Sequence, residues 1–319
     1  MSMDGYERFK EELMEKLKEM EAFVDYDYKI VKTLKANREA YESITAQSKR
    51  ITESHRQCFP LFDIHILYNK YLENSCSMDF VLKFIDKHME KCDNIFTHGQ
   101  SAYNLYLYNI YNYEYVKDRI LLKLINYEIN TEFLEDKIYR RLADLAIVYI
   151  ILMPEVYGVH STITIKKDLF DIWNVSESEM YDQALLNMNR YEKISTMADA
   201  MYNPSSMSKE NYELLKKLTC GMYVVTNAIY VDGASSFLCE KAQEELAKMS
   251  DGFYIFPASV HEMIFMIKDY MIDDKKAAVS MMKEITKGVN TDILSNEDFL
   301  SDNIYYYDAI SHTFTIASK

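Results

Sequence analysis

The chain has 319 residues, of which 49% are hydrophobic, so it is long enough to bury one large core or two ordinary ones. Its seven glycines and four prolines are few, which favours helices and plain hairpins and argues against an all-β sandwich or a glycine-rich phosphate loop. The net charge of −14 repels phosphate backbones and anionic lipids, so we expect neither nucleic acid nor a membrane as a direct partner.

Cysteine usage and the start of the chain indicate a cellular compartment. The five cysteines are odd in number and include no CxxC pair, which argues against a disulfide framework or a zinc ribbon and favours buried thiols in a reducing cytosol. The opening residues are charged throughout, unlike a signal peptide, and the longest apolar run, residues 145–153, is too short to span a bilayer. We therefore expect a cytoplasmic protein, without a metal or a cofactor.

The N-terminal region, residues 1–95, is predicted to contain a helix, a hairpin and a helical segment. Apolar residues of 6–24 fall on one stripe, which indicates a helix. Residues 27–49 alternate weakly around a turn candidate, which favours a hairpin. The stretch after Pro60 indicates a strand that runs into a helix, and Ser77 opens a further helix.

Residues 96–319 are predicted to form the main α+β domain, either separate from the first region or continuous with it. Apolar residues between Val116 and Leu124 indicate a helix, and the branched residues of 144–153 indicate a buried strand. Residues 161–165 form a second strand that can pair with it. Ser176 then opens a helix, because Ser176 and Glu179 have the spacing of a capping box.

The rest of the chain is predicted from shorter patterns. The predicted elements are a polar loop over 201–210, a hairpin over 222–240 around Asp232 and Gly233, a helix over 240–249, one strand or two over 253–267 with a break at Pro257, a helix over 275–287 and a final hairpin over 303–317. The order strand, strand, helix occurs at 144–188 and again at 222–249, which is a weak structural repeat. The sequence thus predicts an α+β fold with mixed or mainly antiparallel sheets backed by helices.

Several stretches together resemble a known family. They are YVKDRILLKLINYEIN, LADLAIVYIILM, WNVSESEMYDQALLNM, MYVVTNAIYVDGASSFL and FPASVHEMIFMI. They are similar to an uncharacterised bacterial family, from anaerobic gut clostridia and their relatives, that is catalogued only as a domain of unknown function. The resemblance covers roughly residues 110–317. It implies a fold and a bacterial cytoplasmic setting, and it carries over no catalytic residue.

The most site-like stretch is Pro257 to Glu262, where polar residues interrupt two apolar runs. On a regular strand, His261 would share a face with Ser259, and Glu262 would point the other way. In a functional interpretation, His261 is a base or a metal ligand, and Glu262, Ser259 or a residue from another strand completes the site. In a structural interpretation, which is the commoner case, the ring of His261 donates to a backbone carbonyl and Glu262 lies at an edge or pairs with a basic residue. The HExxH motif is absent because position 265 is Phe.

Other candidate residues carry weaker signals. They are His160 after the strand loop, Asp144 at the start of a buried strand, Asn227 within another strand, the Ser235–Ser236 pair, which lacks a nucleophile elbow, and Arg140–Arg141, which could grip an anion or answer Glu135 and Asp136. Walker, dinucleotide and kinase motifs do not occur in the sequence.

Two hypotheses about function follow. The first is a non-enzymatic cytoplasmic protein that binds another protein or has a regulatory role. The second is a hydrolase that uses His261 with an acidic or hydroxyl partner. Binding of nucleic acid would need a concealed basic groove. No feature of the sequence indicates an oligomeric state.

Overall fold

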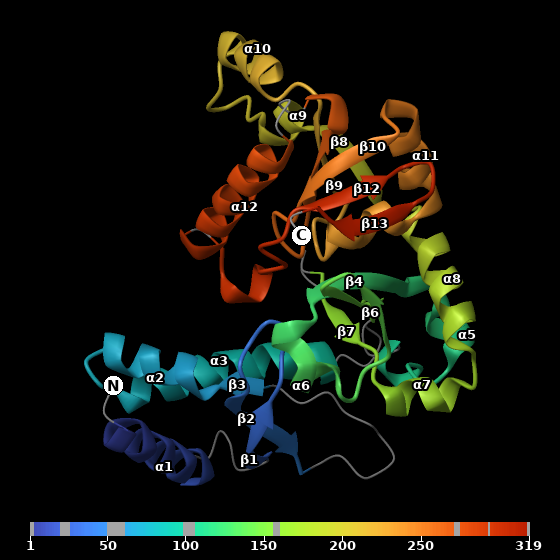
Figure 1. The fold of residues 1–319 in the computed structure, drawn as a ribbon. Coiled ribbons are helices and arrows are strands. Elements are labelled where there is room, and N and C mark those ends of the chain that lie inside the picture. Colours follow the sequence, from blue (N-terminus) through green and yellow to red (C-terminus); the bar gives the residue numbers. More distant parts are fainter. Residues whose placement is uncertain are drawn as a thin grey trace. The chain divides into compact units, whose positions relative to one another are not determined.

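The computed structural model describes residues 3–19, 26–49, 61–97, 106–155, 160–270, 275–292 and 294–317. The chain divides into two compact units, Met1–Ile110 and Tyr111–Lys319. Helices pack with three antiparallel sheets in the described residues (Figure 1). This confirms the predicted α+β fold.

The first unit is a small antiparallel sheet with three helices. Its elements are α1 (Met3–Glu19), β1 (Tyr26–Thr33), β2 (Tyr41–Ser48), β3 (Leu61–Asp63), α2 (Ile64–Glu73) and α3 (Met78–Thr97). The sheet order is β1-β2-β3, and β1 and β2 are the predicted hairpin, with Ile30 opposite Ile44. The core is formed by apolar residues of all three helices and the sheet, including Phe9, Leu13, Ile44, Leu67 and Ile85.

Local capping explains where two helices of this unit begin. The Asp63 carboxylate accepts the backbone N–H of His65 at 2.8 Å, which satisfies a donor that the first turn of α2 leaves open. Arg38 donates to the same carboxylate at 2.6 Å and so ties the β1–β2 turn to the helix. The hydroxyl of Ser77 accepts the N–H of Phe80, which confirms Ser77 as the start of α3.

The second unit contains a six-stranded antiparallel sheet, in the order β13-β12-β10-β11-β9-β8. Its elements are β8 (Glu192–Thr196), α9 (Met197–Met201), α10 (Lys209–Leu218), β9 (Met222–Asn227), η4 (Gly233–Leu238), α11 (Glu240–Met249), β10 (Gly252–Phe256), β11 (Met263–Ile267), η5 (Lys268–Tyr270), α12 (Lys275–Asp292), η6 (Asn296–Asp298), β12 (Tyr305–Asp308) and β13 (Thr313–Ile316). Strands β10 and β11 are the two predicted strands on either side of Pro257, and β12 and β13 are the predicted final hairpin.

Helices cover both faces of this sheet. On one face, Val279 of α12 packs with Tyr254, Met266 and Ile304. On the other face, the ring of Phe237 in η4 lies 5.8 Å from Phe265 and 5.3 Å from Phe314, and α11 follows on the same side (Figure 1). Aromatic rings in offset or edge-to-face contact stabilise a fold by more than the burial of their surface alone.

The same unit contains a four-stranded sheet in which β6 pairs with β4, β5 and β7. Its elements are α5 (Tyr113–Val116), η2 (Lys117–Arg119), β4 (Ile120–Asn126), η3 (Glu128–Asn130), α6 (Thr131–Leu134), β5 (Tyr139–Leu142), β6 (Leu145–Leu152), β7 (Thr162–Thr164), α7 (Lys167–Trp173) and α8 (Glu177–Met188). The predicted pairing of the strands β6 and β7 is confirmed. The capping box of Ser176 and Glu179 at the start of α8 is confirmed as well.

Three predictions for this unit are wrong. Residues from Ile120 to Asn126 are a strand, not a helix, because this apolar run is buried on both faces of β4. Residues after Asp232 form the buried 3₁₀ helix η4, not the second strand of a hairpin. The second copy of the strand-strand-helix repeat is therefore absent. The polar loop predicted at 201–210 is present over residues 202–208, whereas α10, which begins at Lys209, was not predicted.

The structure also shows the environment of three cysteines and the hydropathy of the helices. Cys239 is buried, as expected, whereas Cys76 and Cys220 are exposed, and all three are free thiols. Burial raises the pKa of the Cys239 thiol to about 11. Cys58 lies outside the described residues. Among the described helices, none combines the length and the hydropathy needed to cross a bilayer.

Candidate functional site

The connection between β10 and β11, residues 257–262, contains the three predicted site residues. It is not a continuous strand, so the alternation of faces that the sequence suggested does not apply to it. The N–H of Ser259 donates to the carbonyl of Glu262 at 3.1 Å. The N–H of His261 donates to the hydroxyl of Ser259 at 3.0 Å. The buried Ser259 hydroxyl therefore supports the backbone of the loop.

The imidazole of His261 is held through both of its ring nitrogens. Its Nδ1 lies 3.0 Å from the backbone N of Asp232 and accepts that N–H. Because Nδ1 accepts, the proton of the neutral ring is on Nε2, which donates to Oδ1 of Asp298 at 3.1 Å. The other Asp298 oxygen accepts the hydroxyl of Ser295 at 2.8 Å.

This geometry limits what His261 can do chemically. A general base needs a ring nitrogen whose lone pair faces the proton to be removed. Here the lone pair of Nδ1 is used by the Asp232 amide, although the side chain of His261 is 40% exposed. The structural interpretation predicted a bond donated by the ring to a backbone carbonyl, whereas the ring accepts a bond from the Asp232 amide and contacts the Asp298 carboxylate. The Glu262 side chain makes no hydrogen bond or ion pair with the described residues.

Three charged residues join this site that sequence reasoning missed. Asp232 is 4% exposed, and its carboxylate lies 2.7 Å from Nζ of Lys123 on β4. Asp298 comes from η6, and its backbone carbonyl accepts the N–H of Val260 at 2.9 Å. Lys123, Asp232, His261 and Asp298 thus form a chain of polar contacts that joins β4, the loop before η4, the β10–β11 connection and η6.

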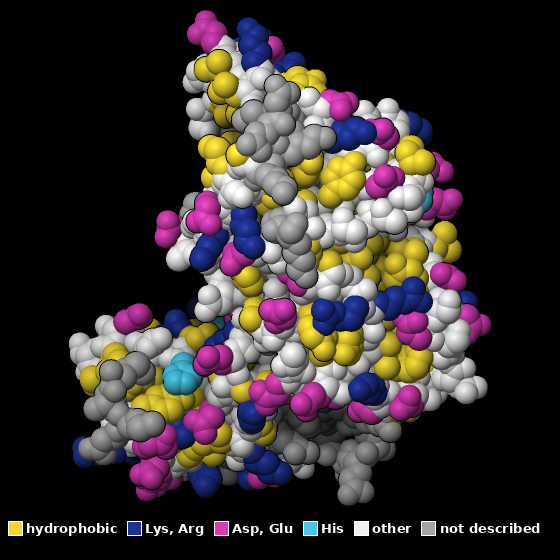
Figure 2. Space-filling model, viewed as in Figure 1, with side chains coloured by type: hydrophobic (Ala, Val, Ile, Leu, Met, Phe, Trp, Pro, Cys, Tyr) yellow, Lys and Arg dark blue, Asp and Glu magenta, His cyan; other side chains and the backbone are white. Residues whose placement is uncertain are grey.

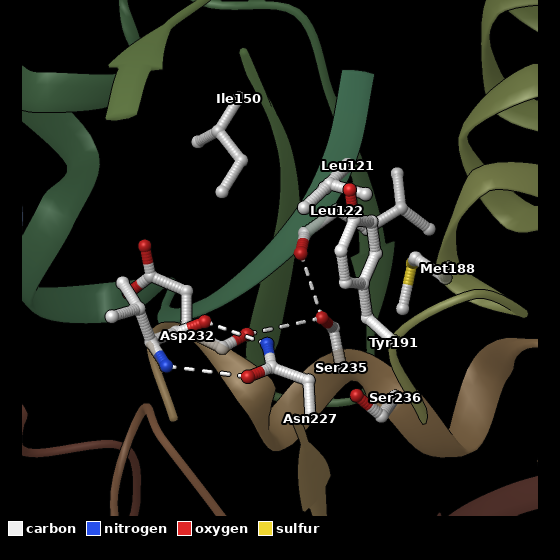
Figure 3. A pocket seen from close by; sticks show the side chains of 10 residues that line it. Leu121, Leu122, Ile150, Met188, Tyr191, Asn227, Asp232, Ser235 and Ser236 are labelled. Atoms are coloured by element: carbon white, nitrogen blue, oxygen red, sulfur yellow. Dashed lines mark hydrogen bonds between the residues drawn. The ribbon is translucent and has the colours of Figure 1, made fainter. Parts of the chain in front are cut away.

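A small cavity lies next to Asp232 (Figure 3). Leu121, Leu122, Ile150 and Met188 form its apolar wall, and Asn227, Asp232, Ser235 and Ser236 are the polar residues that line it. The hydroxyl of Ser235 donates to the carbonyl of Leu122 at 2.7 Å, whereas the hydroxyl of Ser236 makes no hydrogen bond to the other residues drawn. The free volume is about 10 Å³, which is about the space of one water molecule. The cavity is too small for a substrate.

Most of the weaker candidates have structural partners, and three of them, Asn227, Ser235 and Ser236, line the cavity next to Asp232. His160 lies 3.8 Å from Glu155 in its own loop. Asn227 holds the backbone of Val231 through both ends of its amide. Ser235 and Ser236 are buried in η4, and Arg141 stacks over the ring of Tyr127. Asp144 accepts three side-chain hydrogen bonds, two from the segment before β12 and one from Tyr305 at the start of that strand.

Arg140 binds the carboxylate of Glu177. It donates two parallel hydrogen bonds to Glu177, at 2.7 and 2.8 Å, and stacks over the ring of Tyr181 at 3.6 Å. The fully buried Tyr149 donates its hydroxyl to the same carboxylate. The bond from Arg140, and then that from Tyr149, lower the pKa of Glu177. The predicted alternatives for Arg140, Glu135 and Asp136, are not its partners here.

We expect Glu177→Gln to lower the free energy of unfolding by about 1 kcal/mol near neutral pH, because a bidentate, half-buried ion pair is lost. The folded-state pKa of Glu177 is lowered, so its stabilisation is present above the ordinary pKa of a glutamate and is lost as the pH falls through the lowered value. The difference from the wild type should therefore shrink below about pH 4. Urea unfolding at several pH values measures it. The exposed Glu244 of α11 provides the control Glu244→Gln, and a difference that stays constant with pH would contradict the prediction.

In the described part of the chain, no group of three or more His, Cys, Asp and Glu side chains could hold a metal ion.

One comparison with known proteins finds a match, and two do not. No curated protein and no solved structure matches the chain. The model of a family of unknown function, DUF5688, matches residues 6–309, which is nearly the whole chain. The protein therefore belongs to the family of unknown function DUF5688.

Proposed function

We propose that the protein is a protein-binding module and that its docking element is residues 197–221, here called the arm. The arm connects β8 to β9 and contains α9 and α10. No side chain from 199 to 221 is buried. This exposure of α10 and of the end of α9, whose Ala198 is its one buried residue, is the observation that carries the proposal. A bacterial cytoplasmic setting remains a prediction from the resemblance.

The arm is much longer than its connection requires. Strands β8 and β9 are antiparallel neighbours, with Thr196 opposite Tyr223. Two to five residues are enough to join such strands. Joining the two strands therefore does not account for the two helices of the arm. In Figure 1, α10 lies at the end of the second unit, beyond α9.

Only a small number of contacts within the arm stabilise α10 as a helix. Ser208 caps its first turn, and the rings of Tyr202 and Tyr212 lie 4.6 Å apart. The hydroxyl of Tyr212 donates to Asp199 of α9. A helix of ten residues is marginal in water when tertiary packing does not support it. Contact with a partner would supply this packing.

The chemistry of the exposed face fits a protein partner. Leu214 and Leu218, four residues apart on one side of α10, are 55% and 72% exposed, and Met201 of α9 is 50% exposed. Hydrophobic side chains are visible among charged ones over α10 (Figure 2). Burying each leucine would contribute about 1.5 kcal/mol or more. Apolar anchors spaced along one helix face are the usual way in which a helix enters a groove of another protein.

The hydrolase hypothesis receives less support from the geometry at His261. Both ring nitrogens have protein partners, and the cavity near Asp232 holds about one water. The hydroxyl of Ser259 binds backbone rather than the ring. We therefore place function on the arm.

Site-specific crosslinking tests the proposal. A photoreactive residue at position 218 is expected to crosslink one protein in a lysate of the host, and the same residue at Ile310 is not. Ile310 is a matched control because it is 70% exposed in the turn between β12 and β13. The captured protein is then purified and titrated against the wild type and against Leu214→Ser/Leu218→Ser, for which we expect at least tenfold weaker binding.

A chain in which a short turn replaces the arm provides the decisive comparison, since β8 and β9 keep their register. Loss of binding with unchanged thermal unfolding of the rest would support the proposal. Equal binding by the shortened chain, or equal crosslinking from position 310, would overturn it. Binding of the arm to anionic lipid vesicles instead of to a protein would overturn it as well.

A further inference from the structure

The loop between β9 and η4, residues 228–232, has a strained backbone. Tyr230 and Asp232 have φ values of 54° and 55°, in the left-handed region that suits glycine and disfavours an aromatic residue. A residue with a Cβ is destabilised in this conformation. Such strain persists only where surrounding contacts impose the conformation.

Contacts at both ends impose it here. At the start of the loop, Asn227 accepts the N–H of Val231 at 3.2 Å and donates to its carbonyl at 2.7 Å. At the end, Asp232 uses its carboxylate for Lys123, its carbonyl for the hydroxyl of Ser235 and its N–H for Nδ1 of His261. Of these contacts, the one to the ring depends directly on whether an imidazole is neutral.

We propose that His261 is a pH-dependent latch for the 228–232 loop. The neutral ring accepts the Asp232 amide and holds the loop in its strained conformation. A second proton on the ring occupies Nδ1, which then presents an N–H to the amide N–H and can no longer accept it. The latch opens, and the strain in the loop favours its departure.

The charged groups around the ring set the balance between the two states. Asp298 in η6 lies at Nε2 and favours the protonated ring, because its carboxylate pairs with the cation. The Asp232 amide at Nδ1 favours the neutral ring. The Asp232 carboxylate is paired with Lys123 of β4, and Glu262 is the neighbouring residue in the loop of His261 itself. Protonation therefore exchanges a bond to the loop for a stronger bond to η6.

Opening would change the surface near the cavity. Val231 and Asp232 line it on the side of the loop, and Asn227, Ser235 and the Ser236 hydroxyl lie below them (Figure 3). The exposed Tyr230, whose ring lies under Nζ of Lys193, belongs to the same loop and would move with it. Protonation of His261 would thus expose the buried Ser236 hydroxyl to solvent.

Amide hydrogen exchange measures the latch directly. We expect the protection of the Asp232 amide, corrected for intrinsic exchange, to fall about tenfold between about pH 8 and about pH 5.5. The amide of Ala234, which donates to the carbonyl of Val260, is the internal control, since its acceptor does not titrate. Constant protection of Asp232 over this range would overturn the proposal, and so would an equal fall at Ala234.

Two variants separate the latch from general loosening. In His261→Phe the Asp232 amide should be poorly protected at both pH values, with no pH dependence left. Asp298→Asn keeps an acceptor for Nε2 but removes the charge that favours the cation, so opening should require a lower pH than in the wild type. If His261→Phe does not fold, Asp298→Asn still decides. An unchanged or raised pH of opening in that variant would overturn the proposal.

Discussion

Gly233→Ala is expected to lower the free energy of unfolding by about 3 kcal/mol or more. A Cβ at this position would lie 2.5 Å from Oγ1 of Thr226, 2.6 Å from the carbonyl oxygen of His261 and 2.7 Å from the backbone N of Asn227. Two of these atoms are backbone, so they can give way only if β9 or the β10–β11 connection moves. Urea unfolding measures the loss.

Gly288→Ala is the matched control. Gly288 lies within α12, and a Cβ there would meet no atom within 4 Å. Alanine is the better helix former, so this variant should be more stable than the wild type by about 0.5–1 kcal/mol. The two substitutions are therefore expected to change the free energy of unfolding in opposite directions. A Gly233→Ala protein as stable as the wild type would mean that η4 does not pack this closely on β9.

Hydrophobic pattern was enough to predict most elements but did not distinguish a buried strand from a helix. In residues 120–126, ILLKLIN, only Lys123 is not buried. A strand that is covered on both faces has no alternation, and a short apolar run fits either structure. The helix was therefore a reasonable but wrong interpretation, which the pairing of β4 with β6 corrects.

The Asp232–Gly233 dipeptide shows where turn chemistry stops being informative. It correctly marks a tight bend, since Asp232 has a positive φ. The path after the bend is set by packing, because Gly233 lets the backbone of η4 approach β9 and Ser235 binds the carbonyl of Leu122. Neither contact is visible in the local sequence.

The candidate site was only half predictable. His261 could be found because polar residues lie between two apolar runs. Its partners could not, because Asp298 lies 37 residues later and Asp232 lies 29 residues earlier, in loops whose meeting depends on the fold. The arm was missed for another reason. The polar residues of 202–208 correctly favoured a loop, but no helix was predicted after them, although Ser208 is a helix cap and Tyr212 and Leu215 have helical spacing.

Asp144→Ala is expected to cost about 3–4 kcal/mol of unfolding free energy, because one carboxylate serves three donors. Its oxygens accept the hydroxyl of Ser301 at 2.7 Å, the amide of Asn303 at 2.9 Å and the hydroxyl of Tyr305 at 2.8 Å. Tyr305 is fully buried, and burial, with the charge of Asp144, raises its pKa, so the phenol keeps its proton and donates.

A double-mutant cycle with Tyr305→Phe shows whether the cost comes from this network. Asp144→Ala alone strands the buried phenol without an acceptor, whereas the double variant has no phenol to strand. The double variant should therefore lose less stability than the sum of the two single variants, by about 1 kcal/mol or more. Asp171→Ala, at an exposed position in α7, should change stability by less than about 0.5 kcal/mol. Additive losses at 144 and 305 would show that the tie between the β5–β6 turn and β12 is weaker than its geometry indicates.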